Sequence, residues 1–184
     1  MAEIKSTLEL AMERTKKISI TREEKEAIRR KETVQKATGM FHRYLEDRIS
    51  LPEILKEIER TEDKAGAAIR EMLCSQWIDA VSLDVENEKF LRGIESLQGG
   101  NVDAARQELR VLCSQYGKEK DEARQEMRTR LREALRKDGI YGSAVVPHVE
   151  ESTEWKERLG TMEHAFGGEI EKVKETLRRL INQG

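Results

Sequence analysis

The sequence predicts an all-α protein, an irregular bundle of seven or eight helices with long charged helices and one non-helical crossover segment at about residues 139–150. Charged residues make up 38% of the 184 residues and aromatic residues only 4%, yet apolar residues recur at helical spacing. Only two prolines, Pro52 and Pro147, interrupt the chain. Two capping boxes mark helix starts. We expect residues 1–184 to form a single helical unit.

Residues 1–49 are predicted to form an N-terminal helical arm. A first helix is expected over residues 3–17, where apolar residues follow helical spacing. A second begins at a capping box made by Thr21 and Glu24 and runs to about Arg48. In such a box the hydroxyl accepts a hydrogen bond from an unpaired backbone amide, and the carboxylate accepts one in return.

The second helix has a narrow apolar seam that is typical of a coiled coil. Its members recur every seven residues and are Ile20, Ala27, Val34 and Phe41. Because an isolated helix is marginal in water, this seam needs a partner. Three partners are possible: residues 118–137 of the same chain, the same helix of a second chain, or a foreign protein. The sequence favours the second, a homodimer.

Residues 50–138 are predicted to hold the core helices. Ser50 and Glu53 form the second capping box, with Pro52 in the first turn, where its missing amide costs nothing. Residues 65–116 contain 13 charged residues, against 29 in residues 1–64. We therefore expect the main core within residues 65–116.

Glycines and acidic residues predict the helix boundaries in this part of the chain. One helix is expected to end near Ser82, and Asp84 is the predicted cap of the next. Gly99-Gly100 is a strong stop. The following helix is predicted to run over residues 102–137, because one apolar stripe continues across Gly117, and a single interior glycine costs about 1 kcal/mol.

Residues 139–152 are predicted to form an irregular segment between helices. Its aliphatic side chains Ile140, Val145 and Val146 are expected to lie against the core, while Pro147 prevents helix. Residues 153–184 are predicted to form C-terminal helices, with a hinge at Gly167-Gly168.

Arginines spaced by four residues form the clearest electrostatic feature. They lie about 6 Å apart in helical rise and are Arg124, Arg128, Arg132 and Arg136. Such a row could bind phosphates, as in a nucleic-acid or anion binder, or an acidic partner helix. Alternatively, the aliphatic stems flank the neighbouring apolar stripe, and the charges complement the helix dipole. A net charge of −2 does not favour nucleic acid.

Tyr141, Ser143 and His148 are the clustered hydroxyl and imidazole groups outside the predicted helices. An enzyme would be expected to have its site here, but a crossover loop is the favoured interpretation. No metal-binding or phosphate-loop motif is present, so no cofactor is expected. Cys74 and Cys113 are expected to be reduced thiols on apolar helix faces.

The pattern Gly-Ile-x-Gly-Ser-Ala-Val-x-Pro at residues 139–147, followed by Glu-Glu-Ser-Thr-Glu-Trp, resembles an uncharacterised family of small cytosolic bacterial helical proteins with a domain of unknown function. The resemblance covers most of the chain and implies no particular activity.

The sequence as a whole favours a non-enzymatic protein-interaction or scaffold module. Neither a signal peptide nor an apolar stretch long enough to span a membrane is recognisable, so a cytoplasmic location is expected. The alternatives are an anion or nucleic-acid binder that uses the arginine row, and an enzyme with a site around residues 141–148.

Overall fold

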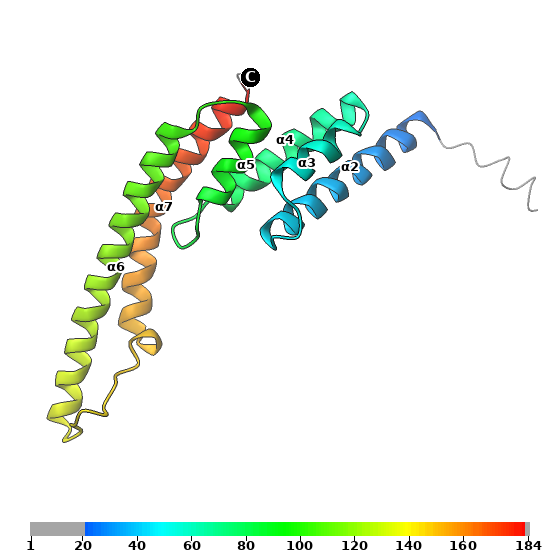
Figure 1. The fold of residues 1–184 in the computed structure, drawn as a ribbon. Coiled ribbons are helices and arrows are strands. Elements are labelled where there is room, and N and C mark those ends of the chain that lie inside the picture. The colour runs from blue at the N-terminus through cyan, green and yellow to red at the C-terminus, as the bar shows by residue number, and fades with distance from the viewer. Residues whose placement is uncertain (1–20, 183–184) are drawn as a thin grey trace, which may run out of the picture.

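The structure, a computed structural model, describes residues 21–182, and within them it is all-α, as predicted (Figure 1). It has one short 3-10 helix, η1 (Val149–Glu151), and no strand in this range. Its six α-helices are α2 (Arg22–Leu45), α3 (Leu51–Glu59), α4 (Asp63–Ala80), α5 (Glu88–Gln98), α6 (Asp103–Lys137) and α7 (Thr153–Asn182). The helix predicted at residues 3–17 lies outside the described residues.

One of the seven or eight predicted helices lies outside the described residues, and residues 21–182 contain six because Gly167-Gly168 does not break the last helix. Both glycines lie inside α7, which continues for 30 residues. Trp155 is buried before the pair and Ile170 after it. Packing on both sides outweighs the helix-propensity cost of about 1 kcal/mol per glycine. The predicted continuity of α6 across Gly117 is confirmed.

Both predicted capping boxes are present. The Thr21 amide donates to Glu24 Oε2 at 2.8 Å, and the Glu24 amide donates to Thr21 Oγ1 at 3.1 Å. The amide and the hydroxyl of Ser50 both donate to Glu53 Oε2, at 2.8 and 2.7 Å. These bonds lower the pKa of the Glu53 carboxyl, the hydroxyl bond contributing most. Local sequence therefore fixes the starts of α2 and α3.

The start of α5 differs from the prediction, because Asp84 does not cap it. The capping position is Asn87, whose buried side chain instead bonds the backbone of Ser82 through Nδ2 at 2.8 Å and Oδ1 at 3.1 Å. Asp84 pairs with Lys120 Nζ of α6 at 2.8 Å. The Asp84 side chain, which local spacing predicted to cap α5, therefore forms a long-range ion pair instead.

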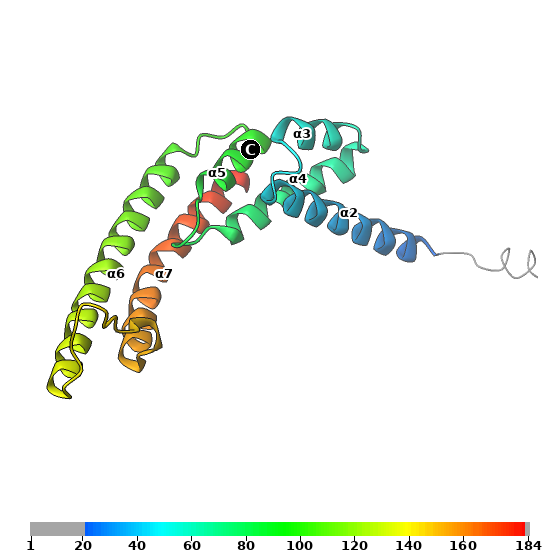
Figure 2. The same cartoon turned by 60° about the horizontal axis from the view of Figure 1, so that its bottom comes forward.

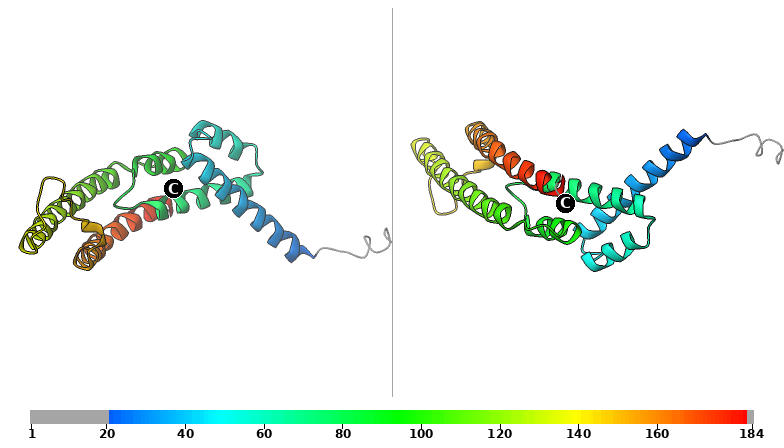
Figure 3. Two further views of the ribbon diagram at one scale, coloured as in Figure 1. Left: turned by 90° about the horizontal axis from the view of Figure 1, so that it is seen from below. Right: turned by 90° about the horizontal axis from the view of Figure 1, so that it is seen from above.

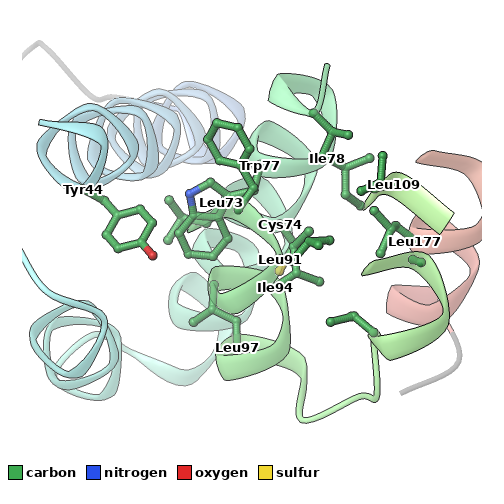
Figure 4. Packing of buried hydrophobic residues seen from close by; sticks show 14 of the residues in the cluster. Tyr44, Leu73, Cys74, Trp77, Ile78, Leu91, Ile94, Leu97, Leu109 and Leu177 are labelled. Atoms are coloured by element: carbon green, nitrogen blue, oxygen red, sulfur yellow. The ribbon is translucent and has the colours of Figure 1, made fainter. Parts of the chain in front are cut away.

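Helix α4 lies at the centre of the fold, with α2, α3, α5 and α7 packed around it (Figures 1 and 3). Leu73, Trp77 and Ile78 of α4 are fully buried, and Figure 4 places them between side chains of the neighbouring helices. All six helices contribute buried residues to this main core. Within the predicted segment 65–116 it contains buried residues from Ile69 to Leu112, and it extends beyond that segment to α2, α3 and the end of α7.

Gly93 lets α5 approach α4 closely. A Cβ atom built on Gly93 would lie 2.7 Å from the ring of Trp77. Real Cβ atoms essentially never come so near, and the opposing ring is rigid and buried. The ring also makes an edge contact with Tyr44 of α2, with centroids 5.4 Å apart. Trp77 therefore joins three helices at one point.

Helices α6 and α7 form a long hairpin that extends away from the main core (Figure 2). A second cluster, the hairpin core, lies between them. Its fully buried members are Ala123, Met127, Val149 and Trp155. Leu131, Leu159 and Met162 pack against it half-buried.

The pairing of α6 with α7 overturns one partner considered for the seam of α2. Residues 118–137 lie against α7, not against α2. Helix α2 buries Ala37, Met40 and Tyr44 on the side that packs on α4. Val34 of the seam remains 44% exposed. No helix among residues 21–182 has the length and apolarity needed to cross a membrane.

Candidate functional site

The tip of the α6–α7 hairpin brings together residues from both predicted site regions. The ion pair of Arg130 with Glu154, 2.7 Å between Nη1 and Oε1, sets the first turn of α7 level with residue 130. Residues 131–137 of α6 therefore extend beyond α7, and the connecting segment runs back along them (Figure 1).

The aliphatic side chains of the connecting segment, residues 138–152, were predicted to lie against the core, and for Ile140 and Val146 that prediction is wrong. Ile140 and Val146 are 50% and 59% exposed, and Val145 and Pro147 are half-buried. Only its last part, at Val149, is fully buried. The reason is geometric, because α6 extends beyond the first turn of α7. No second helix of the described residues therefore lies across from the end of α6 to enclose these side chains.

Glycine gives the tip a defined backbone. The Ile140 amide donates to the Leu135 carbonyl at 2.8 Å, and the Gly139 amide donates to the Arg136 carbonyl at 3.1 Å. With Gly139 at φ +79°, this is a Schellman motif, which satisfies the last carbonyls of α6. Gly142, at φ +144°, then opens a turn closed by the Val145 amide at 3.2 Å.

A pocket of about 790 Å³ lies between this turn and the last turns of α6. We call it the tip pocket. Its lining residues are Arg132, Arg136, Ile140, Tyr141, Gly142, Ser143 and Val145. It therefore joins half of the arginine row to two of the three predicted loop residues.

The arginine row is divided between two environments. Arg124 pairs with Glu150 Oε1 at 2.8 Å and lies over the ring of Trp155, 5.9 Å from its centroid. Arg128 is half-buried and its Nε is enclosed. Arg132 and Arg136 form no ion pair with any residue in the range 21–182. The first two arginines thus cover the hairpin core, and the last two face the tip pocket.

His148 is not part of the tip pocket. It is exposed and precedes η1, outside the lining that contains Tyr141 and Ser143. Within the described part of the chain, no hydrogen bond joins it to Ser143. A nucleophile paired with a general base, which acyl-transfer chemistry requires, is not assembled there.

Two polar residues that sequence reasoning missed hold α5 against α6. Arg106 pairs with Glu88 at 3.2 Å, with Glu95 at 2.8 Å and with Asp103. The hydrogen bond with Glu95 is the largest reason why the pKa of its guanidinium is raised. Asn87 Nδ2 reaches Cys113 Sγ at 3.6 Å. Apart from the pair with Asp103, which lies within α6, these contacts join residues that are distant in the sequence, so no local motif indicates them.

Both cysteines are free thiols, as predicted. Cys74 is fully buried, and desolvation raises the pKa of its thiol to about 11. Burial also raises the pKa of the half-buried Cys113 thiol. A reactive cysteine needs the opposite shift. Both thiols therefore serve packing.

Within residues 21–182, no group of three or more histidine, cysteine or acidic side chains is placed to hold a metal ion. Comparison of the chain with models of protein families, with curated proteins and with solved structures gives no match.

Proposed function

We propose that this protein is a non-enzymatic protein-interaction module of the cytoplasm that uses the free end of α2 as its contact surface. The observation that carries the proposal is the exposure of residues 22–32 on every side of the helix. No other described element packs on this stretch (Figure 3).

The free end of α2 has apolar side chains to bury. Ile28 is 48% exposed and Val34, just beyond the free end, is 44% exposed, with Ala27 also on the surface. Three turns of helix on which no element of residues 33–182 packs gain little stability alone. A partner helix laid along Ala27 and Val34 would supply the missing contact, as in a coiled coil.

We propose a second copy of this chain as the partner, which makes the module a homodimer. Acidic residues predominate in the first half of the free end, residues 22–26, and basic residues in the second half, residues 29–32. The acids of the first half are Glu23, Glu24 and Glu26, beside Arg22 and Lys25, and the bases of the second half are Arg29, Arg30 and Lys31, beside Glu32. An antiparallel copy would set the acidic part of one helix beside the basic part of the other. Such pairs fix orientation more than they add affinity.

Sedimentation equilibrium of the purified protein tests this proposal. We expect a concentration-dependent species of twice the 21.2 kDa monomer mass. Val34→Asp should return it to monomer, because a carboxylate in the seam would be desolvated. Val111→Asp is the matched control, since Val111 is 46% exposed on α6.

A monomer at all concentrations would overturn the homodimer. A photo-crosslinker placed at residue 34 would then test the wider proposal, with residue 111 as its control site. A cross-link to one specific protein from residue 34 alone supports a foreign partner, whereas equal cross-linking from both sites contradicts the use of α2.

The second candidate function, binding of anions or nucleic acid by the arginine row, has narrower support. Only Arg132 and Arg136 face a pocket, while Arg124 is occupied by Glu150. A duplex-binding surface needs several free cations in a row. The geometry favours a small anionic ligand over a nucleic-acid strand. The third candidate, an enzyme at residues 141–148, has the weakest support, because His148 lies apart from Ser143.

A further inference from the structure

We propose that the tip pocket binds a small phosphorylated ligand with a planar ring, of the mononucleotide class. The site is independent of the interaction surface on α2 and lies at the opposite end of the molecule (Figures 1 and 2). Arg132 and Arg136 would hold the phosphate, and Tyr141 the ring.

Charge is the first reason. The lining of the tip pocket contains two arginines and no carboxylate. Three other hollows on the described part of the chain each contain at least two acidic residues, such as Glu86 and Glu88 beside α5, or Glu108 and Glu169 between α6 and α7. In a chain with 36 acidic residues, a lining that contains two arginines and no carboxylate from residues 21–182 differs from those three hollows.

Donor geometry is the second reason. Arg132 and Arg136 are one helical turn apart, so both guanidinium groups can reach one anion from the same side of α6. A guanidinium donates two parallel hydrogen bonds to phosphate oxygens. The hydroxyl of Ser143, on the facing turn, adds a further donor.

The connecting segment supplies the rest of the site. Tyr141 is 77% exposed, so its ring is free to stack on a planar ligand. Ile140 and Val145 provide apolar surface beside it. The volume of about 790 Å³ lies within the roughly 300–1,000 Å³ of small-molecule sites. The backbone is set by Gly139 and Gly142, whose φ values other residues rarely adopt.

Isothermal titration calorimetry of the full chain tests the proposal, with AMP, adenosine and inorganic phosphate as separate probes. We expect one AMP per chain with Kd below about 1 mM. Adenosine and phosphate should each bind at least about tenfold more weakly than AMP, because each lacks half of the contacts. Absence of saturable AMP binding would overturn the proposal.

Paired substitutions locate the site. Combined Arg132→Gln and Arg136→Gln should raise the Kd for AMP by about tenfold or more, because two charge-assisted contacts are lost. Arg29→Gln is the control, an exposed arginine on α2. An equal loss in the control would mean nonspecific charge attraction and would contradict the site.

Tyr141→Ala tests the contact with the planar ring of the ligand separately from the contact with its phosphate. The side chain is exposed, so its removal should leave the fold intact, as circular dichroism would verify. Binding of AMP should weaken while binding of inorganic phosphate stays the same. A single-stranded oligonucleotide is the last probe. If it binds more tightly than AMP, and if the double arginine variant loses this binding, the pocket binds a nucleic-acid strand and the proposal of a small ligand is wrong.

Discussion

All six described helices contribute to the main core, whereas the hairpin core is enclosed by α6, α7 and η1 alone. Each region contains one of the two tryptophans. Trp77 is enclosed by α2, α4 and α5, with no exposed surface. Trp155 is also buried, but the guanidinium of Arg124 lies over its ring. Apolar side chains alone therefore bury Trp77, whereas Trp155 is covered by the apolar residues of the hairpin core and by a partly exposed cation.

This difference predicts different stability in the two regions. A residue packed by several helices is released only when the whole core opens, while a two-helix cluster can open locally. The tip pocket lies beyond the hairpin core, at the less stable end. Substitutions of matched chemistry in the two regions test this comparison.

The largest effect is expected for the tryptophans. Trp77→Ala should lower the free energy of unfolding by about 3–5 kcal/mol, because the cavity lies among helices that cannot all collapse into it. Trp155→Ala should lower it less, since water can enter the hairpin. Urea denaturation followed by circular dichroism gives both values. Equal losses would contradict the comparison.

The buried thiol of Cys74 is expected to make the main core sensitive to alkali. Its pKa rises from 9.0 to about 11 on folding, so its stabilising contribution is complete below pH 9 and is lost as the pH rises to 11. Two pKa units correspond to about 2–3 kcal/mol.

Denaturation at pH 8 and pH 11 measures this loss. The parent protein should lose more stability over this range than Cys74→Ala, which has no thiol to titrate. Cys113→Ala is the comparison at a half-buried position. If the Cys74→Ala variant and the parent protein lose the same amount of unfolding free energy, the Cys74 thiol is not buried as the structure indicates.

Glycine-to-alanine substitutions should have opposite signs in the two regions. Gly93→Ala should cost about 1–3 kcal/mol, because the new methyl group meets the ring of Trp77 and α5 must move. Gly160→Ala in α7 has nothing within 4 Å of the new atom. It should stabilise by up to about 1 kcal/mol through helix propensity. Thermal unfolding of both variants decides whether the signs differ.

The smallest expected effect concerns Arg124. Arg124→Gln removes the ion pair with Glu150 and the contact with the Trp155 ring, which should cost about 0.5–1 kcal/mol because the side chain is partly solvated. Hydrogen exchange should quicken in residues 149–162 and stay the same in α4. Faster exchange in both regions would mean that the hairpin core opens only together with the main core.

Features that depend on neighbouring residues could be predicted from the sequence. The capping boxes at Thr21 and Ser50 and the stops at Gly99 and Gly139 have their partners within a few residues. Apolar periodicity likewise indicated α6 as one helix, since its buried stripe continues across Gly117.

Features that depend on distant pairing could not be predicted. The fate of Asp84 depends on Lys120, which the fold brings to it from 36 residues away. Ile140 and Val146 are exposed because α6 extends beyond the first turn of α7. No local sequence pattern indicates this offset between the two helices. The same offset divides the arginine row, because only Arg124 and Arg128 lie level with the hairpin core. The tip pocket combines two predicted regions, and nothing in their spacing along the chain indicated that they would meet.

The continuity of α6 has a mechanical consequence. Its 35 residues correspond to a rod of about 52 Å, anchored in the main core at one end and bearing the tip pocket at the other. A stiff rod keeps the spacing between its ends constant. Whatever binds at the tip is therefore held clear of whatever binds along α2, and the two can occupy the molecule at once without steric competition.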